Sequence, residues 1–212
     1  MKILLVAATA KELTPIQRKL EREQPAHDIF NLVTGIGMIA TTFQLTKTLN
    51  EERFDLVINL GIAGAFDRTL TLGEVVEVIR DQFSEEVVED GDELKTYEEI
   101  SLRETDKFPF KKGRLHSSYQ IQNAKLAKVT GITVNAVHGN EQSIKSIVKR
   151  LNPQIESMEG AAFFYVCSQF KTPATQIRAI SNYVEKRDRE TWEVELALNN
   201  LAEATKTILS TL

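Results

Sequence analysis

Short apolar runs that alternate with amphipathic segments are the feature that most limits how this chain can fold. The first run, 2–8, is too short for a membrane span and has the continuous apolar character of a strand buried on both faces. Similar runs recur at 28–33, 56–60 and 175–180, separated by segments of helical periodicity. The alternation predicts a single three-layer α/β/α domain over 1–212, with a central, mostly parallel mixed twisted sheet.

Turn and cap residues predict where several of these elements begin and end. Thr14 followed by Pro15 predicts the start of the first helix, because proline is favoured in a first helical turn. The glycines within 61–64 predict the end of one strand, and a run of Ile, Thr and Val predicts another over 131–137. The helix expected over 38–49 has an apolar face that is predicted to be buried: Ile39, Phe43 and Leu45.

The stretch 84–106 differs in character from the rest of the chain. It is acidic, has little periodicity and includes the run Glu-Asp-Gly-Asp-Glu at 89–93. This composition predicts an exposed excursion from the one domain rather than a linker between two. A solvated loop is the simpler interpretation, and a flap near a binding site is the alternative.

Charge and cysteine content limit which binding partners and which cellular compartment are expected. The chain has 26 Lys and Arg against 30 Asp and Glu, a net charge of −4, and no long basic block, which argues against nucleic-acid or membrane-surface binding. Cys167 is the one cysteine, so a reduced cytoplasmic setting is expected. The apolar run after Lys2 has the outline of a secretion signal, but its removal would delete a predicted strand.

Neither a cofactor nor a metal is predicted. The segment 35–40 has the form G-x-G-x-x-A, with Asp55 near the spacing of a dinucleotide fingerprint. However, that segment follows the second strand and Asp55 precedes a strand, so a tight turn is the better interpretation. The histidines His27, His116 and His138 have no paired ligand spacing, which argues against a zinc site.

Three charged residues stand where parallel strands are expected to end. Glu12 follows the first strand, either as the reciprocal residue of a capping box with Thr9 or as a general base. Glu159 starts a helix, where a carboxylate complements the macrodipole or binds a ligand. Arg178 lies within an apolar strand and therefore needs an anionic partner, for which Glu12 or Glu159 would serve.

Together these segments resemble the superfamily of nucleoside phosphorylases and 5'-methylthioadenosine/S-adenosylhomocysteine nucleosidases. The resemblance rests on the strand before Glu12, the Gly-Ile-Gly turn at 35–37, the segment 57–64, and the pairs Met158-Glu159 and Arg178 with Ser181. It implies a nucleoside phosphorylase-like fold and homo-oligomers, dimers or larger. It also implies site roles: Glu12, Arg178 and Asn182 for catalysis; Met158 and Glu159 for ribose; Val137, Gly139, Ser181 and Asn182 for the base; and Ile36 and Trp192 for the 5' pocket.

Two departures from the superfamily pattern change the expected reaction. Asn182 stands where adenine-specific members have Asp, and an amide can donate to a 6-oxo group and accept from a protonated N7, so a 6-oxopurine is expected. The segment 57–64 has Asn59 and Ile62 where phosphate-binding members have Arg and Ser, so water is the expected nucleophile. Because an amide is not an acid, the proton for the leaving purine is expected to arrive through water.

Three further segments are similar to futalosine hydrolases of menaquinone biosynthesis: 137–141, 157–164 and 180–187. This similarity implies that futalosine is hydrolysed to hypoxanthine and dehypoxanthinyl futalosine. An adenine-releasing 5'-methylthioadenosine/S-adenosylhomocysteine nucleosidase with an unusual Asn is the main alternative. A purine nucleoside phosphorylase and a non-catalytic nucleoside-binding protein are further alternatives, and the presence of both Glu12 and Arg178 argues against the last.

Overall fold

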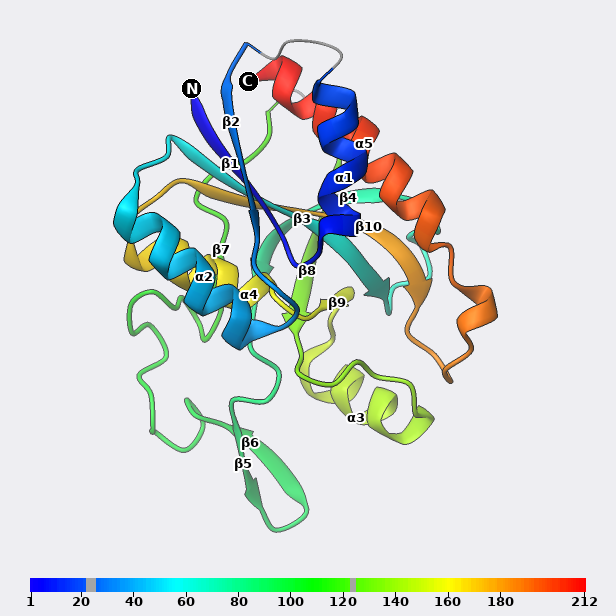
Figure 1. The fold of residues 1–212 in the computed structure, drawn as a ribbon. Helices are drawn as coiled ribbons and strands as arrows, with labels where there is room; N and C mark the ends of the chain where they lie inside the picture. The colour runs from blue at the N-terminus through cyan, green and yellow to red at the C-terminus, as the bar shows by residue number, and fades with distance from the viewer. Residues whose placement is uncertain (22–25, 123–124) are drawn as a thin grey trace.

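The computed structural model of the chain describes residues 1–21, 26–122 and 125–212. In these residues one eight-stranded sheet and one two-stranded sheet form (Figure 1). The larger sheet contains β1 (Lys2–Ala7), β2 (Asp28–Val33), β3 (Leu56–Ala65), β4 (Val75–Asp81), β7 (Leu115–His116), β8 (Ala127–Thr133), β9 (Ile155–Ser157) and β10 (Ala174–Tyr183). The smaller one contains β5 (Val87–Asp90) and β6 (Glu93–Thr96). The helices are α1 (Ala10–Leu20), α2 (Met38–Glu51), α3 (Glu141–Leu151), α4 (Gly160–Gln169), α5 (Val194–Thr211) and the 3-10 turn η1 (Arg189–Thr191).

The larger sheet confirms the predicted mixed, mostly parallel topology. Its strand order is β10-β4-β8-β9-β3-β1-β2, with β7 paired to β4. β10 also pairs with β3, so the path from β3 through β9, β8, β4 and β10 returns to its start. Pairing is antiparallel where β4 meets β7 and β10 and where β3 meets β9, and it is parallel in the other pairs.

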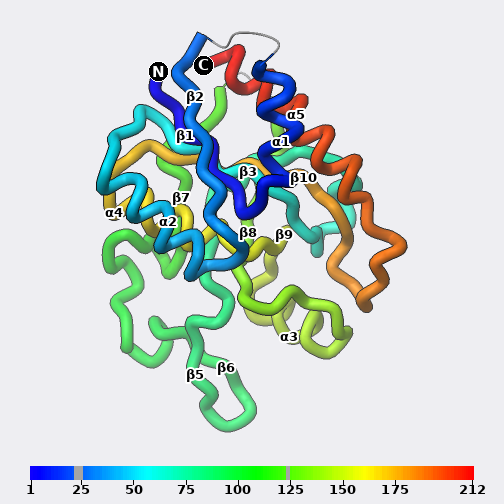
Figure 2. The backbone as a smooth tube through the Cα atoms, viewed as in Figure 1, coloured from blue at the N-terminus to red at the C-terminus, as the bar shows by residue number. Residues whose placement is uncertain are grey.

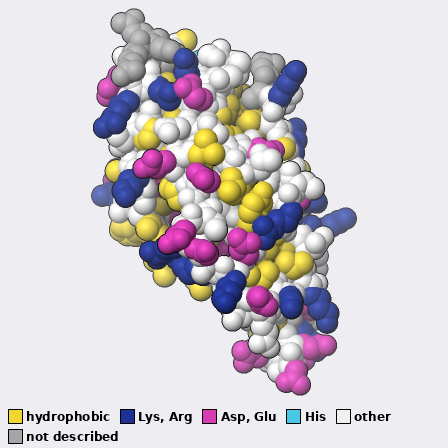
Figure 3. Space-filling model, turned by 90° about the vertical axis from the view of Figure 1, so that its right-hand side faces the viewer, with side chains coloured by type: hydrophobic (Ala, Val, Ile, Leu, Met, Phe, Trp, Pro, Cys, Tyr) yellow, Lys and Arg dark blue, Asp and Glu magenta, His cyan; other side chains and the backbone are white. Residues whose placement is uncertain are grey.

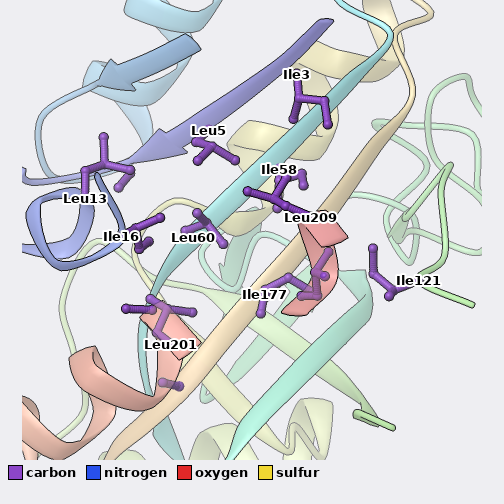
Figure 4. Packing of buried hydrophobic residues seen from close by; sticks show 14 of the residues in the cluster. Ile3, Leu5, Leu13, Ile16, Ile58, Leu60, Ile121, Ile177, Leu201 and Leu209 are labelled. Carbon is purple, nitrogen blue, oxygen red and sulfur yellow. The ribbon is translucent and has the colours of Figure 1, made fainter. Parts of the chain in front are cut away.

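Helices cover the sheet on two sides, as the three-layer prediction requires. α1 packs against α5 on one side, and α2 packs against α4 on the other (Figure 1). Between α1, α5 and the sheet lies a buried apolar cluster that includes Leu5, Ile58, Ile177 and Leu201 (Figure 4). Each such side chain contributes about 1.5–3 kcal/mol by leaving water. Among the described residues, no helix combines the length and the apolar character needed to cross a membrane.

The strand β3 continues through the glycines that were predicted to end it. Gly61 pairs with Arg178 on β10, and a Cβ on Gly61 would lie 2.1 Å from the Arg178 guanidinium. A Cβ on Gly64 would lie 2.9 Å from a Val184 methyl and 3.2 Å from the Asn182 amide nitrogen. The turn prediction is therefore wrong, because these glycines make room for neighbouring side chains rather than for a change of direction.

The helix α1 begins at Ala10, four residues before the predicted start at Thr14. Thr9 is the N-cap and forms a capping box with Glu12, which satisfies donors of the first turn. Pro15 consequently lies inside the helix, where it removes one backbone donor. Burial of Leu13 and Ile16 on the sheet compensates for that lost bond.

The helix α2 begins at Met38, as predicted, but the expectation that its apolar face is buried is wrong for two of the three residues. Leu45 is buried, as expected, whereas Ile39 is 85% exposed and Phe43 is 65% exposed. These two residues lie four apart, on a helical face that points away from the sheet. The strand predicted over 131–137 is displaced toward the N-terminus, because β8 extends over Ala127–Thr133 and 134–137 form an irregular segment.

The acidic excursion contains a hairpin, so the expectation of an irregular loop is wrong over β5 and β6. Asp90 pairs with Glu93 around the two-residue turn Gly91-Asp92, a sequence typical of tight hairpins. The hairpin extends from the body at the opposite end from both chain termini (Figure 2). Acidic side chains gather at this end of the molecule (Figure 3).

Candidate active site

The three charged residues predicted for the site meet at the carboxyl edge of three adjacent parallel strands, β1, β3 and β10. Glu12 lies in the first turn of α1, directly after β1. Arg178 lies on β10 beside Gly61 of β3. Glu159 is the N-cap of α4 and follows β9, which pairs with the end of β3. The fold thus brings three charged residues from distant parts of the sequence to one edge of the sheet.

Glu12 both caps the first turn of α1 and faces the candidate site. Its Oε2 accepts hydrogen bonds from the backbone N–H of Thr9 at 2.9 Å and from the Thr9 hydroxyl at 2.8 Å. Its Oε1 is oriented toward β3, 3.4 Å from the backbone nitrogen of Ile62. The side chain is buried. The predicted capping box therefore exists, and it uses one oxygen of Glu12 while the other faces the site.

Arg178 is the most completely buried charged residue of the site, with 1% of its surface exposed. Its Nε donates to Gln176 at 2.9 Å, and its Nη2 donates to the side-chain oxygen of Asn59. Its Nη1 lies 3.8 Å from the Glu159 carboxylate. Of the two carboxylates that the sequence offered, Glu159 is thus the ion-pair partner. Glu12 is nevertheless close, because its Oε1 and the guanidinium approach the same face of Gly61.

Glu159 lies between two helix N-termini. It caps α4, and its Oε1 accepts a hydrogen bond from the backbone N–H of Gly37 at 3.0 Å, where Gly37 caps α2. Both helix ends place partial positive charge near this buried carboxylate. The bond from Gly37 and the ion pair with Arg178 fix the position of the Glu159 carboxylate. Its neighbour Met158 packs at the edge of an apolar cluster that includes Ile132.

Asn182 and Ser181 lie at a bulge near the end of β10, where the register against β3 shifts. The Ser181 hydroxyl donates to Asn182 Oδ1 at 2.8 Å, and Asn182 Nδ2 donates to the carbonyl of Tyr183 at 3.0 Å. These bonds fix the orientation of the half-buried amide. They use one of its two N–H groups and one of its oxygen lone pairs, so one donor and one acceptor stay available.

A carboxylate that was given no role from the sequence lies across Gly64 from this amide, and it binds the imidazole of His138. Glu156, on β9, is paired with Gly64, and Gly64 is paired in turn with Asn182. Glu156 is buried and binds His138 twice, at 2.6 Å from its Oε2 to the ring Nδ1 and at 3.0 Å from the backbone N–H to its Oε1. Glu156 was missed because nothing in the sequence shows that this strand pairs with the end of β3. His138 lies within the range 137–139 expected to line the base, but its pairing with Glu156 was not predicted.

The predicted base and 5' residues lie around the bulge of β10. Gly139 accepts a hydrogen bond from the backbone of Arg187 at 3.2 Å, and the Arg187 guanidinium lies 5.2 Å from the Trp192 ring centroid. The residue after Trp192 donates its N–H to the carbonyl of Ser181 at 2.8 Å. Val137 is exposed on the same loop as Gly139. Ile36, also exposed, lies instead beside the cap of α2.

A buried polar network supports Arg178 from behind. Gln176, which accepts from Arg178, donates to Asp81 Oδ2 at 3.2 Å. Asp81 Oδ1 accepts from the Thr133 hydroxyl at 3.0 Å. Burial raises the pKa of the Asp81 carboxyl from 3.8 to about 6, and the bonds from Gln176 and Thr133 and the charge of Arg178 act in the opposite direction. Gln176 thus links the guanidinium to a buried carboxyl whose pKa is raised.

Metal and thiol chemistry find little support in the structure. Among the described residues, no group of three or more His, Cys, Asp or Glu is placed to hold a metal ion. Cys167 is buried in α4, and burial raises the pKa of its thiol. This cysteine behaves as a small core residue packed among apolar side chains.

Comparisons with known proteins show to which family the chain belongs. The family described as the phosphorylase superfamily matches residues 14–212. The chain is 26% identical to a futalosine hydrolase of Thermus thermophilus over 182 residues, which cover 84% of this chain and 80% of that protein. It is 28% identical to a 5'-methylthioadenosine/S-adenosylhomocysteine nucleosidase of Geobacillus over 240 residues, which cover 100% of this chain and 99% of that protein.

Solved structures show the same fold. The MTA/SAH nucleosidase of Streptococcus pneumoniae, solved in complex with 8-aminoadenine, superposes with a TM-score of 0.82. The sequence identity is 19%, and the match covers 100% of both chains. At this identity the similarity concerns the path of the backbone, and the side chains of the site must be judged from their own geometry.

Proposed function

The chain belongs to the phosphorylase superfamily. We propose that its substrate is a 6-oxopurine nucleoside, namely futalosine. It is an enzyme, an N-glycosyl hydrolase of the group that contains futalosine hydrolases and 5'-methylthioadenosine/S-adenosylhomocysteine nucleosidases. The products of the proposed reaction are hypoxanthine and dehypoxanthinyl futalosine. We assign the reaction to menaquinone biosynthesis in the cytoplasm.

The amide of Asn182 is the observation that carries the choice of substrate. After its bonds to Ser181 and Tyr183, it keeps one N–H and one lone pair. The N–H suits the 6-oxo group of hypoxanthine, and the lone pair suits a protonated N7. An adenine amino group would leave the N–H facing another donor, and a site built for one polar group discriminates strongly against such a mismatch.

Water rather than phosphate is the proposed nucleophile, because the glycine-rich end of β3 offers no anion clamp. Asn59 is buried, and its amide is already engaged with the carbonyl of Val6 at 3.1 Å and with Arg178. Ile62 contributes an apolar side chain. Glu12 keeps one oxygen oriented toward the site, where it can accept a proton from the attacking water.

The ribose is assigned to Glu159 and Met158. The Glu159 carboxylate accepts hydrogen bonds from the 2'- and 3'-hydroxyls. It also stabilises the positive charge that develops on the sugar as the N-glycosidic bond breaks. Arg178 orients Glu159 through their ion pair, and its proximity to Glu12 allows it to order the water as well. Met158 packs against the sugar ring.

The 5' end of the substrate is assigned to Ile36 and Trp192. Arg187, which lies over the Trp192 ring, is available to pair with the carboxylate that distinguishes futalosine from inosine. Ile36, Ile39 and Phe43 form an exposed apolar surface next to Gly37. We propose that a second copy of the chain covers this surface and closes the 5' pocket, so that the working unit is a dimer or larger.

The proposed activity is tested by a product assay in phosphate-free buffer with futalosine, inosine and 5'-methylthioadenosine. Release of hypoxanthine from futalosine at the highest kcat/KM, with little from inosine, is expected. Adenine release from 5'-methylthioadenosine would instead support the second candidate, a 5'-methylthioadenosine/S-adenosylhomocysteine nucleosidase. The match to the Geobacillus nucleosidase over the full length of this chain favours that candidate. A requirement for added phosphate would refute hydrolysis.

A further inference from the structure

Departure of the purine needs a proton at N7, and the residues assigned so far do not supply it. Glu12 takes a proton from water, and Asn182 is an amide that can accept a hydrogen bond but is not an acid. Any donor must therefore lie at the base end of the site, near Asn182. The sheet places one titratable pair there.

A row of three paired residues crosses the sheet at this end. Asn182 of β10 is opposite Gly64 of β3, and Gly64 is opposite Glu156 of β9. A Cβ on Gly64 would lie 3.2 Å from the Asn182 amide nitrogen and 3.6 Å from Glu156 Cγ. Both side chains therefore lie on the same face of the sheet, on either side of Gly64, where a Val184 methyl also packs.

Glu156 holds His138 in one orientation. Its two oxygens accept from the ring Nδ1 at 2.6 Å and from the backbone N–H of His138 at 3.0 Å. The edge of the imidazole contacts Phe66, with 6.0 Å between ring centroids. Among the described residues no hydrogen bond to Nε2 of His138 is found, and the side chain is 15% exposed. The ring is therefore fixed at one nitrogen and open at the other.

We propose that His138, oriented by Glu156, is the general acid that protonates N7 of the leaving purine. The inference rests on the proposed nucleosidase function and completes its proton balance. The bond from C1' to N9 breaks, and water forms the new bond to C1' while Glu12 accepts the proton that this water loses. Nε2 of the imidazolium gives its proton to N7, so that neutral hypoxanthine leaves and His138 becomes neutral. The proton on Glu12 then returns to His138 through solvent.

The hydrogen bonds of Glu156 and His138 indicate a different role for each residue. Glu156 accepts the Nδ1 hydrogen and stabilises the imidazolium, as carboxylates do for catalytic and metal-binding histidines. Asn182 accepts the N7 hydrogen once the proton has been transferred. Glu156 is thus a positioning residue, and His138 is the group that reaches the base. The competing interpretation is that the pair only ties the 134–140 loop to β9.

A substrate methylated at N7 separates the two interpretations. A 7-methylpurine nucleoside already carries positive charge on the base and needs no proton in order to leave. For His138→Gln we expect kcat to fall about 10²–10³-fold on the unmethylated nucleoside and to stay near the wild-type value on its 7-methyl form, after subtraction of the uncatalysed rate. Equal losses on both substrates, or no loss on either, would overturn the proposal.

Two further variants keep the test interpretable. Glu156→Gln keeps the shape of the side chain and should lower turnover about 10–100-fold on the unmethylated substrate alone. His27→Gln changes a histidine at the start of β2 and should affect neither substrate. If the wild type releases adenine and not hypoxanthine, the proposed substrate fails. The same ratio measured on the adenine nucleoside and its 7-methyl form still decides the role of His138.

Discussion

The two ends of the candidate site are built in different ways. At the water and ribose end, Glu12, Glu159 and Arg178 are buried and fixed by strands, helix caps and an ion pair. At the base end, Asn182 and His138 are half-buried and lie on a bulge and an irregular loop. A rigid end that activates water and holds the ribose is therefore joined to an adaptable end that recognises the base and its leaving. Changes at the first should lower turnover whatever the base, and changes at the second should have effects that depend on which base is bound.

The sharpest test of the rigid end is Glu12→Gln. The amide keeps an oxygen for the capping bond to Thr9 but is not a base, so kcat should fall about 10³-fold while KM and the unfolding midpoint change little. Steady-state kinetics with futalosine and urea unfolding measure the two effects. Glu21→Gln, at the exposed end of α1, is the matched control. Near-normal turnover would remove Glu12 from the mechanism.

Arg178→Met tests whether the same end is held by its charges. Removing the guanidinium leaves Glu159 buried with no cation, and the free energy of unfolding should fall by about 3–5 kcal/mol. Lys19→Met breaks a more exposed pair with Glu203 and should lower the free energy of unfolding far less. Similar losses in the two variants, measured by urea unfolding, would contradict a rigid charged frame.

The pH dependence of stability tests the network behind Arg178. Because the pKa of Asp81 is raised from 3.8 to about 6, the folded protein holds this proton more tightly than the unfolded chain. The contribution of Asp81 to the free energy of unfolding should therefore decrease between about pH 4 and pH 6, by about 3 kcal/mol in total. The free energy of unfolding of Asp81→Asn, measured across the same pH range, should not show that decrease. Parallel curves for both proteins would refute the assignment.

Asn182→Asp tests the adaptable end and should have the smallest effect on the fold. The carboxylate can accept from an adenine amino group, so the ratio of kcat/KM for 5'-methylthioadenosine over futalosine should rise at least about 10-fold. The unfolding midpoint should change little. Asn31→Asp, on exposed β2, adds the same charge and should leave the ratio unaltered. An unchanged ratio for Asn182→Asp would place base recognition elsewhere.

Sequence reasoning succeeded where a local pattern has one physical meaning. The buried strands, the alternation with helices and the family all follow from short apolar runs and a few motifs, and the capping box of Thr9 and Glu12 was recognised from its spacing. It failed where the same residue type serves two purposes. Gly61 and Gly64 were interpreted as turn residues, although both lie within β3. The face of α2 that carries Ile39 and Phe43 was expected to be buried because it has the periodicity of a core-facing helix, yet both side chains are exposed.

The sequence by itself therefore determined the fold class and which charged residues end up at strand ends, because hydrophobic periodicity and caps act over a few residues. Only the tertiary structure decided which charges meet. It paired Arg178 with Glu159, placed Asp81 behind Gln176, and brought Glu156 and His138 beside Asn182 across Gly64. Such meetings depend on strand register between distant segments, and a shift of one residue would turn each side chain to the opposite face of the sheet.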